Sequence, residues 1–319
     1  MKAIQIIENN SEIGAGTRGA SLGIEALKMA SIKAKSDYFS KYTTQAIGTK
    51  NELLFQENET PNAIRIEGIV QVYENLTENI ANVLATGSFP LILAADHASA
   101  GGTIAGIKKQ YPNQSLGVIW IDAHGDLHSP YTSPTGNVHG MPLATALNED
   151  NVECKINEVS EVEKQYWDAL KNAGGVSPKI EADQLIFYGV RDTEHPEEDL
   201  ISRYGIKNFS VEECRDKGID QISREGLELL SNCDIIYISF DVDSMDPNMT
   251  SHGTGTPVDN GFSAKEANDL IQNLIESKKV VCFEMVEINP LLDERKNKMA
   301  EVAFEILENT SQSIEKYSL

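Results

Sequence analysis

Apolar runs and amphipathic stretches alternate along most of the chain. Runs dominated by Ile, Val, Leu and Phe predict strands that are covered on both faces. The predicted strands span residues 3–7, 90–94, 116–121, 184–190, 234–240 and 280–286. Stretches whose apolar residues recur three and four positions apart predict helices that bury one face. The predicted helices span residues 20–33, 63–85, 102–109, 161–172, 197–204, 224–231, 264–277 and 296–310.

This alternation of strands and helices predicts the fold class. It is typical of a mostly parallel sheet between two helical layers, so we expect a three-layer α/β/α architecture. No internal repeat, low-complexity tract or linker divides the sequence, which predicts a single domain over residues 1–319. Residues 35–61 and 123–138 are predicted to be loops, and residues 149–180 are polar and predict little beyond one helix. In such sheets the chemistry lies beyond the carboxyl ends of the strands.

Composition narrows the classes of partner. The chain has 27 Lys and Arg against 49 Asp and Glu, a formal net charge of −22, which disfavours nucleic acids and anionic membranes as partners. The four cysteines are far apart, which argues against a disulfide framework or a thiolate zinc site. The first residues do not resemble a signal peptide, and no apolar run is long enough to cross a membrane. We therefore expect a cytoplasmic protein.

Acidic residues and histidines follow three of the predicted strands. Asp96-His97 follows the run at 90–94, Asp122-Ala123-His124-Gly125-Asp126 follows 116–121, and Asp241-Val242-Asp243 follows 234–240. Because alternate strand residues point to the same side, the side chains within each motif can converge. A single Asp at a strand end commonly caps the next helix. Two acidic clusters with histidines instead predict a metal site, since crowded buried carboxylates need a compensating cation.

The charges of the candidate ligands suggest how many ions bind. Four carboxylates balance two divalent cations, and two ions about 3.5–4 Å apart are a common hydrolytic arrangement. A set rich in oxygen and lacking thiolates favours Mn²⁺ over Zn²⁺, with Fe²⁺, Co²⁺ and Ni²⁺ as alternatives. The candidate ligands are His97, Asp122, His124, Asp126, Asp241 and Asp243.

Taken together, these motifs resemble those of the ureohydrolases, which include arginases, agmatinases and formimidoylglutamases. The motifs are D-A-H-G-D at 122–126, G-N-V-H-G-M-P at 136–142 and S-F-D-V-D at 239–243. The resemblance begins at G-A-G-T-R-G, residues 14–19, and continues to E-I-N-P, residues 287–290. It implies an arginase-like fold, a hydrolase of linear amidine carbon–nitrogen bonds, and a homo-oligomer that is a trimer or a hexamer.

The resemblance also implies how the ligands are shared between two Mn²⁺ ions per subunit. Asp122 and Asp241 would bridge both ions. The first ion would also bind His97 and Asp126, and the second would also bind His124 and Asp243. A hydroxide bridging the ions would attack the guanidinium carbon.

Three further roles follow from the same resemblance. Asp126 would pass a proton to the leaving amine, His139 matches a proton-shuttling histidine, and Glu287 matches the residue that holds the guanidinium group. Two ordinary interpretations remain open. Glu287 could be a buried strand-end carboxylate paired with a Lys or Arg, and His139 could be a hydrogen-bonded loop histidine.

Two segments indicate which substrate is bound, and both are most like those of arginases. Ser133, Thr135 and Asn137 lie where arginases surround the α-carboxylate of arginine. Glu194 and Glu197 match a segment that holds the α-amino group, and an acidic helix start favoured by the helix macrodipole is the alternative interpretation. Thr256 is also assigned to substrate binding.

The sequence departs from the arginase pattern in places. His128, which is assigned to substrate binding, stands where most arginases carry an Asn near the substrate carboxylate. In addition, Ala94-Ala95 replaces Gly-Gly, and the loop at 250–257 is one residue longer. The segment 287–294 also resembles formimidoylglutamases.

The leading hypothesis is therefore a manganese arginase that converts L-arginine to L-ornithine and urea, within arginine metabolism. An agmatinase, a formimidoylglutamase or another guanidino-acid hydrolase is the alternative. A one-zinc deacetylase relative is disfavoured because one ion needs fewer carboxylates. A non-catalytic metal-dependent binding protein is disfavoured because every ligand, His139 and Glu287 are present.

Overall fold

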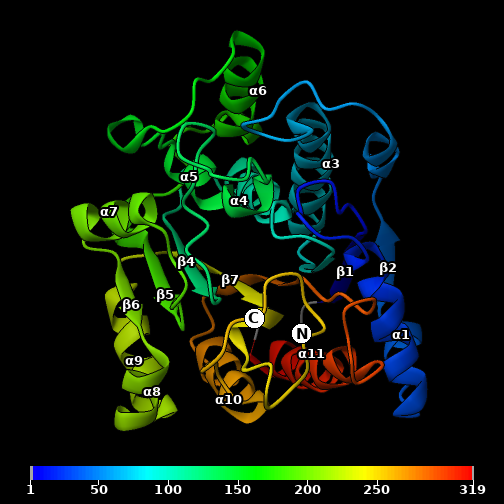
Figure 1. Ribbon diagram of the computed structural model, residues 1–319. Helices are drawn as coiled ribbons and strands as arrows, with labels where there is room; N and C mark the ends of the chain where they lie inside the picture. Colours follow the sequence, from blue (N-terminus) through cyan, green and yellow to red (C-terminus); the bar gives the residue numbers. More distant parts are fainter. Residues whose placement is uncertain (1–2, 318–319) are drawn as a thin grey trace.

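One parallel sheet organises the computed structural model, which describes residues 3–317 (Figure 1). Its eight described strands run in the order β2-β1-β3-β8-β7-β4-β5-β6, and every neighbouring pair is parallel. The strands are β1 (Ile4–Asn9), β2 (Thr43–Ala46), β3 (Phe89–Ala94), β4 (Leu116–Ile121), β5 (Leu185–Tyr188), β6 (Lys207–Phe209), β7 (Ile235–Asp241) and β8 (Val280–Val286).

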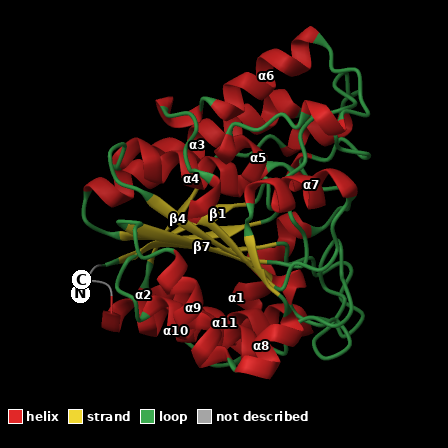
Figure 2. Ribbon diagram, turned by 90° about the vertical axis from the view of Figure 1, so that its left-hand side faces the viewer, coloured by secondary structure: helices red, strands yellow, loops and turns green. Residues whose placement is uncertain are grey.

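Helices cover both faces of this sheet (Figure 2). One layer contains α3 (Ile66–Ala85), α4 (Ser99–Gln110), α5 (Pro142–Leu147), α6 (Glu161–Lys171) and α7 (His195–Tyr204). The other contains α1 (Gly23–Lys33), α2 (Tyr38–Lys41), α8 (Val211–Lys217), α9 (Ile219–Leu229), α10 (Ala264–Ile275) and α11 (Lys298–Tyr317). Short 3₁₀ segments lie at Ala20–Leu22, Asn51–Phe55, Val138–Gly140, Val152–Cys154, Ala173–Gly175, Ala182–Gln184 and Val242–Ser244.

The hydrophobic core is divided by the sheet into two clusters, one on each face. The side chains of β3, β4, β7 and β8 are buried along their whole length, which explains their near-continuous apolar sequences. One cluster packs against α1, α10 and α11, and the other packs against α3 and α4. The predicted three-layer α/β/α fold class is therefore confirmed, with every described strand parallel.

One predicted loop contains a strand that its sequence did not indicate. Residues 35–61 include β2, which pairs with β1 along the register Gln5–Thr43 to Glu8–Ala46. All four β2 residues, Thr-Thr-Gln-Ala, are exposed. An edge strand paired on one side and solvated has no apolar run, so the hydrophobic pattern could not reveal it.

The order of the strands determines which chain segments meet at the carboxyl edge of the sheet. Strands β3 and β4 are consecutive along the chain, yet β8 and β7 lie between them in the sheet. The four central strands therefore bring segments of distant sequence to one edge, at a point where the order of the strands changes direction. Within residues 3–317, none of the helices is both long enough and apolar enough to cross a membrane.

Candidate functional site

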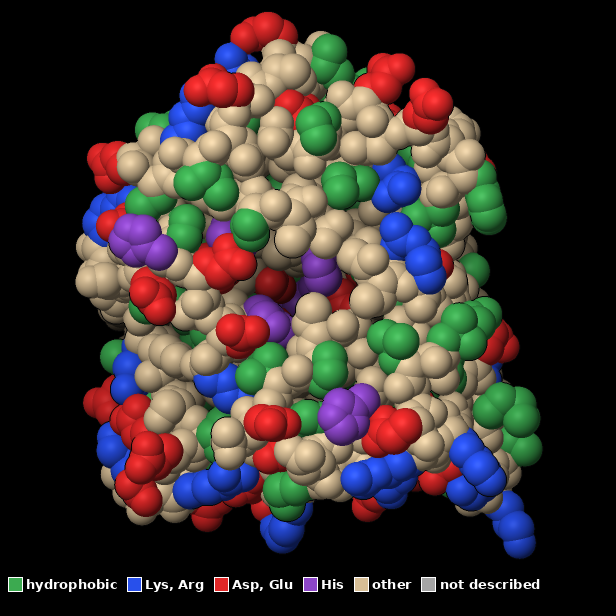
Figure 3. Space-filling view, viewed as in Figure 1, with side chains coloured by type: hydrophobic (Ala, Val, Ile, Leu, Met, Phe, Trp, Pro, Cys, Tyr) green, Lys and Arg blue, Asp and Glu red, His purple; other side chains and the backbone are tan. Residues whose placement is uncertain are grey.

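A cavity of about 170 Å³ opens at the carboxyl ends of the central strands. Histidine and acidic side chains gather in a hollow on this face (Figure 3). Five of the six candidate metal ligands and every candidate catalytic and substrate-binding residue line the cavity; the sixth ligand, Asp122, is fully buried. The lining residues are His97, His124, Asp126, His128, Ser133, Pro134, Thr135, Asn137, His139, Gly140, Asp192, Glu194, Glu197, Asp241, Asp243, Thr256 and Glu287.

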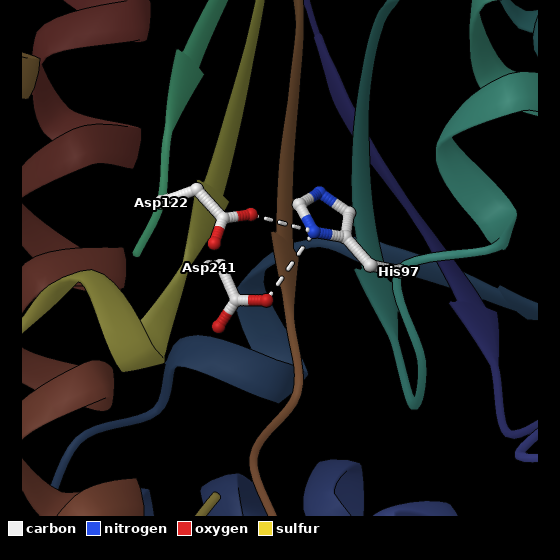
Figure 4. A group of neighbouring side chains, drawn as sticks. All are labelled: His97, Asp122 and Asp241. Atoms are coloured by element: carbon white, nitrogen blue, oxygen red, sulfur yellow. Dashed lines mark ion pairs between the residues drawn. The ribbon is translucent and has the colours of Figure 1, made fainter. Parts of the chain in front are cut away.

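The first group of candidate ligands surrounds one nitrogen of His97. This Nδ1 lies 3.0 Å from Asp122 Oδ2, 3.1 Å from Asp126 Oδ2 and 3.2 Å from Asp241 Oδ2. Figure 4 shows the Asp122 and Asp241 carboxylates, which come from two different strands, both pointing at the His97 ring. Three carboxylates thus converge on one imidazole nitrogen.

The other nitrogen of His97 indicates what this group binds. Its Nε2 lies 2.7 Å from Ser239 Oγ, on strand β7. If Nε2 donates to the serine, Nδ1 carries only a lone pair. His97 Nδ1 and Asp122 Oδ2 are both buried and have no hydrogen-bond partner among the described residues. Buried electron-rich atoms that face one another repel unless a cation lies between them, so these residues fit a metal ion.

A second group shares Asp122 with the first. His124 Nδ1 lies 3.1 Å from Asp243 Oδ2 and 3.4 Å from Asp122 Oδ1. One ligand atom from each of Asp122, His124 and Asp243 falls within 4.8 Å of the others, as it does for His97, Asp122 and Asp241. Because the two oxygens of Asp122 face different groups, its carboxylate can connect two ions.

Burial and mutual repulsion perturb these carboxylates. Burial, followed by the charge of Asp122, raises the pKa of Asp126 to about 6. Burial and the charges of Asp243 and Asp122 raise the pKa of Asp241 well above its usual value. Burial also raises the pKa of Asp243. The cluster therefore resists carrying its full negative charge unless a cation compensates it.

Glu287 joins the metal-ligand region to His139. Its Oε1 accepts hydrogen bonds from the His97 backbone N–H at 3.0 Å and from His139 Nδ1 at 3.1 Å. Burial opposes protonation of His139, but Glu287 and the charge of Asp126 raise its pKa above the usual value. Glu287 has φ 67° and Asp126 has φ 50°. Such left-handed conformations cost non-glycine residues about 1–2 kcal/mol and are concentrated at functional sites.

The candidate carboxylate-binding residues lie on the loop that follows β4. Ser133 Oγ accepts the Gly136 N–H at 2.9 Å, and Thr135 Oγ1 accepts the Asn137 N–H at 3.2 Å. These bonds hold the loop in place and use the hydroxyl oxygens as acceptors. The hydroxyl hydrogens of Ser133 and Thr135 consequently remain available to a ligand in the cavity.

The candidate ammonium-binding residues face the same cavity from the start of α7. Glu197 Oε2 accepts the Glu194 N–H at 3.1 Å, and Glu197 Oε1 accepts the Leu127 N–H at 3.1 Å. Burial raises the pKa of Glu197 to about 7 against the effect of these bonds. His128 Nε2 lies 3.1 Å from Glu194 Oε2. The helix start and the cavity wall are therefore the same segment, and Glu194 and Glu197 belong to both.

Thr256 contacts a candidate ligand as well as lining the cavity. Its hydroxyl donates to Asp243 Oδ2 at 3.1 Å. Arg191, which follows β5, ties the loop that carries Thr256 to the 3₁₀ segment after β7, because it donates to Asp243 O at 3.0 Å and to Val258 O at 2.8 Å. The structure thus places Thr256 where it holds the Asp243 carboxylate.

Two residues of this region have no role in the sequence prediction. Ser239 contacts His97, and because it lies two residues before Asp241 on one strand, side-chain alternation could have revealed it. Asp192 lines the cavity, with its Oδ2 3.8 Å from His124 Nε2. It lies just beyond β5 in an acidic segment, which was a usable signal.

Comparison with known proteins supports the motif-based expectation. The sequence model of the Arginase family matches residues 3–311. The chain is 34% identical over 307 residues to the arginase of Brevibacillus brevis, covering 96% of each chain. It is also 34% identical over 312 residues to the arginase of Bacillus subtilis strain 168, covering 97% of each chain.

Solved structures give the same result. The native arginase of Bacillus caldovelox superposes with a TM-score of 0.82 at 32% identity, covering 97% of this chain and 98% of that one. The formimidoylglutamase of Bacillus subtilis superposes with a TM-score of 0.75 at 20% identity, which indicates a shared fold alone.

Proposed function

The chain belongs to the Arginase family and is therefore a hydrolase of guanidino carbon–nitrogen bonds, and we propose that its substrate is L-arginine. The products would be L-ornithine and urea. One observation carries the proposal. A single cavity combines a carboxylate beside the metal-ligand region, Glu287, with hydroxyl donors on the loop after β4 and acidic residues at the start of α7. A substrate with a planar cation at one end and an amino-acid group at the other fits that combination.

Two Mn²⁺ ions are the proposed cofactor. His97, Asp122, Asp126 and Asp241 would hold one ion, and Asp122, His124, Asp241 and Asp243 the other. The oxygen-rich donor set favours Mn²⁺, while Fe²⁺, Co²⁺ and Ni²⁺ remain alternatives. When bound, such ions supply a water-derived nucleophile near neutral pH.

Glu287 would bind the guanidinium group. Its carboxylate is buried, and one oxygen is already fixed by His97 and His139. A fixed carboxylate beside the candidate ligands would orient a planar cation toward the residues that would hold the ions. Asp126, whose carboxylate lies beside His97 Nδ1, would transfer a proton to the departing amine. His139 would exchange protons with solvent through the cavity.

The amino-acid end of the substrate distinguishes arginine from agmatine. Agmatine has no α-carboxylate, so it would leave the donors on the β4 loop unused. Ser133, Thr135 and Asn137 would bind the α-carboxylate of arginine, and Glu194 and Glu197 would bind its α-ammonium group. The close approach of Glu194 and His128 supports an ordered recognition surface here.

A product assay tests the proposal. The Mn²⁺-reconstituted protein is incubated separately with L-arginine, agmatine and N-formimino-L-glutamate, and urea and formamide are quantified. Urea from L-arginine in large excess over the other reactions is expected. Urea from agmatine or formamide from the formimino substrate would contradict the arginine assignment while retaining a metal-dependent hydrolysis.

Family resemblance also supports a homo-oligomer. We expect a trimer or a hexamer, and light scattering coupled to size-exclusion chromatography measures the mass directly. A monomer at micromolar concentration would contradict this expectation.

A further inference from the structure

His128 points at acidic side chains, although its sequence position predicts proximity to the substrate carboxylate. Its Nε2 lies 3.1 Å from Glu194 Oε2 and 3.7 Å from Glu197 Oε2. Its Nδ1 lies 3.2 Å from Thr132 Oγ1. The His128 side chain is 10% exposed, whereas that of Glu194 is 54% exposed. A buried ring therefore touches the end of a largely solvated carboxylate.

The hydrogen-bond partners determine where the imidazole proton lies. Ionised carboxylate oxygens only accept, so the Nε2 that faces Glu194 must donate. Thr132 Oγ1 accepts the Ser129 N–H at 3.0 Å, and its own hydrogen is shared between His128 Nδ1 at 3.2 Å and the Ser129 carbonyl oxygen at 3.5 Å. The neutral imidazole with hydrogen on Nε2 is consequently satisfied at both nitrogens.

We propose that His128 is a positioning residue that holds Glu194 over the cavity for the α-ammonium group of the substrate. This inference rests on the proposed function and deepens it. His128 then serves the amino group through Glu194, and the α-carboxylate is bound by the β4 loop. The substitution of His for the residue usual in arginases changes which substrate group this position recognises.

Electrostatics support this division of roles. A substrate carboxylate placed at His128 Nε2 would also meet the carboxylates of Glu194 and Glu197, which lie within 4 Å of that atom. Repulsion would oppose such a pose. A substrate ammonium beside Glu194 would be attracted, and a carboxylate held in advance loses less conformational freedom on binding.

Two substitutions at one position separate positioning from packing. Gln in His128→Gln carries an amide N–H that reaches about as far as Nε2, so it can still donate to Glu194. Asn in His128→Asn is one methylene shorter and cannot reach it. The matched control is His252→Asn, because His252 also pairs with a glutamate, Glu294, at 3.3 Å but lies outside the cavity lining.

The test measures kcat and KM for L-arginine, and Ki for δ-guanidinovalerate as a competitive inhibitor. This analogue keeps the guanidinium and carboxylate groups but lacks the α-amino group. We expect His128→Asn to raise KM for L-arginine about tenfold, with a much smaller effect on kcat and less than about a twofold change in Ki. His128→Gln should recover most of the loss, and His252→Asn should behave like wild type.

A double-mutant cycle completes the test. Glu194→Gln should also raise KM, and adding His128→Asn to it should raise KM little further, because the two residues act as one unit. Equal increases in KM and Ki, or fully additive effects, would overturn the inference. Metal content and thermal unfolding are measured for each variant, and a His128→Gln protein that folds normally but behaves like His128→Asn also overturns it.

The proposed function can fail separately. Wild-type protein that releases no urea from L-arginine overturns that function together with the α-ammonium assignment. Wild-type protein that hydrolyses L-arginine while His128→Asn behaves identically overturns only the role of His128.

Discussion

In the proposed function, guanidinium binding depends most on Glu287. Its carboxylate is buried and already accepts two N–H groups, so the remaining acceptor capacity is fixed in direction. Glu287→Gln keeps the shape and removes the charge. Hydrogen bonds to charged groups contribute about 1.5–3 kcal/mol, so kcat/KM for L-arginine should fall about 10- to 150-fold in steady-state kinetics.

A second buried glutamate, Glu284 on the strand β8 that precedes Glu287, provides the control. Glu284 accepts hydrogen bonds from Ser99 and Tyr237 and does not line the cavity. Glu284→Gln should reduce thermal stability and leave kcat/KM within about threefold of wild type. Equal losses of kcat/KM in both variants would contradict the special role of Glu287.

The pKa of Glu197 predicts a pH dependence of substrate affinity. Burial raises this pKa to about 7, so the side chain is largely neutral below that pH and ionised above it. The attraction for an α-ammonium group therefore increases with pH, and KM for L-arginine should fall between about pH 6 and pH 8. Because this pKa is higher in the folded than in the unfolded state, the contribution of Glu197 to stability decreases as pH rises from about 4.3, where the unfolded chain ionises, to about 7.

Glu197→Gln checks this assignment. The amide does not titrate, so the decrease in KM over the same pH interval should disappear or shrink. A wild-type KM that stays constant, or an unchanged profile in the variant, would show that Glu197 does not control affinity.

At the scale of the elements, sequence prediction succeeded where burial is complete. The strands β4 and β8 have the predicted bounds because apolar residues fill them from end to end. The strands β2 and β6 and the short helices α5 and α8 were not predicted. Each of these elements has seven or fewer residues, which is too short for a clear hydrophobic period. The strand β2 is also fully exposed, so its pairing with β1 rather than its local sequence creates it.

The candidate site, like the fold, could be predicted from the sequence only in part. The acidic and histidine motifs at the ends of β3, β4 and β7 indicated the ligand cluster, because motif spacing is a local property. The contact of Ser239 with His97 and that of Glu194 with His128 join segments far apart in sequence. Such contacts depend on strand order and loop path, which one sequence does not specify.

Lys179 connects two elements of one helical layer. Its side chain is almost fully buried, and Nζ donates to the carbonyl oxygens of Thr145, Leu170 and Lys171 at 3.3, 3.2 and 2.7 Å. The last two carbonyls lie at the end of α6, where intrahelical donors are lacking. Lys179→Met should therefore lower the free energy of unfolding by about 2–3 kcal/mol, measured by urea denaturation.

The control for Lys179 is an exposed lysine. Lys265 has a side chain that is 82% exposed, and Lys265→Met should change stability by less than about 0.5 kcal/mol. Burial also lowers the pKa of Lys179 to about 7, which reflects the cost of enclosing its charge. If Lys179→Met were as stable as wild type, that cost would equal the contribution of the three hydrogen bonds.

At the scale of the whole molecule, we predict that metal binding and folding are linked. The ligands come from β3, β4 and β7, so the cluster exists only when the central sheet is assembled. Its carboxylates are buried within a chain of net charge −22, and cations that bind the folded state relieve their repulsion. Metal removal should consequently affect the stability of the entire fold and not merely one loop.

Thermal unfolding with and without metal tests this linkage. An ion present at about 100 times its Kd stabilises the folded state by about 2.7 kcal/mol, so two ions should raise Tm by at least about 5 °C over chelated protein. Asp122→Asn weakens the carboxylate shared by both ligand groups and should remove most of that increase. Asp269→Asn, an acidic residue on α10 outside the cavity, should retain it. Equal Tm values with Mn²⁺ and with chelator would contradict the linkage, because ions that bind only the folded protein must stabilise it.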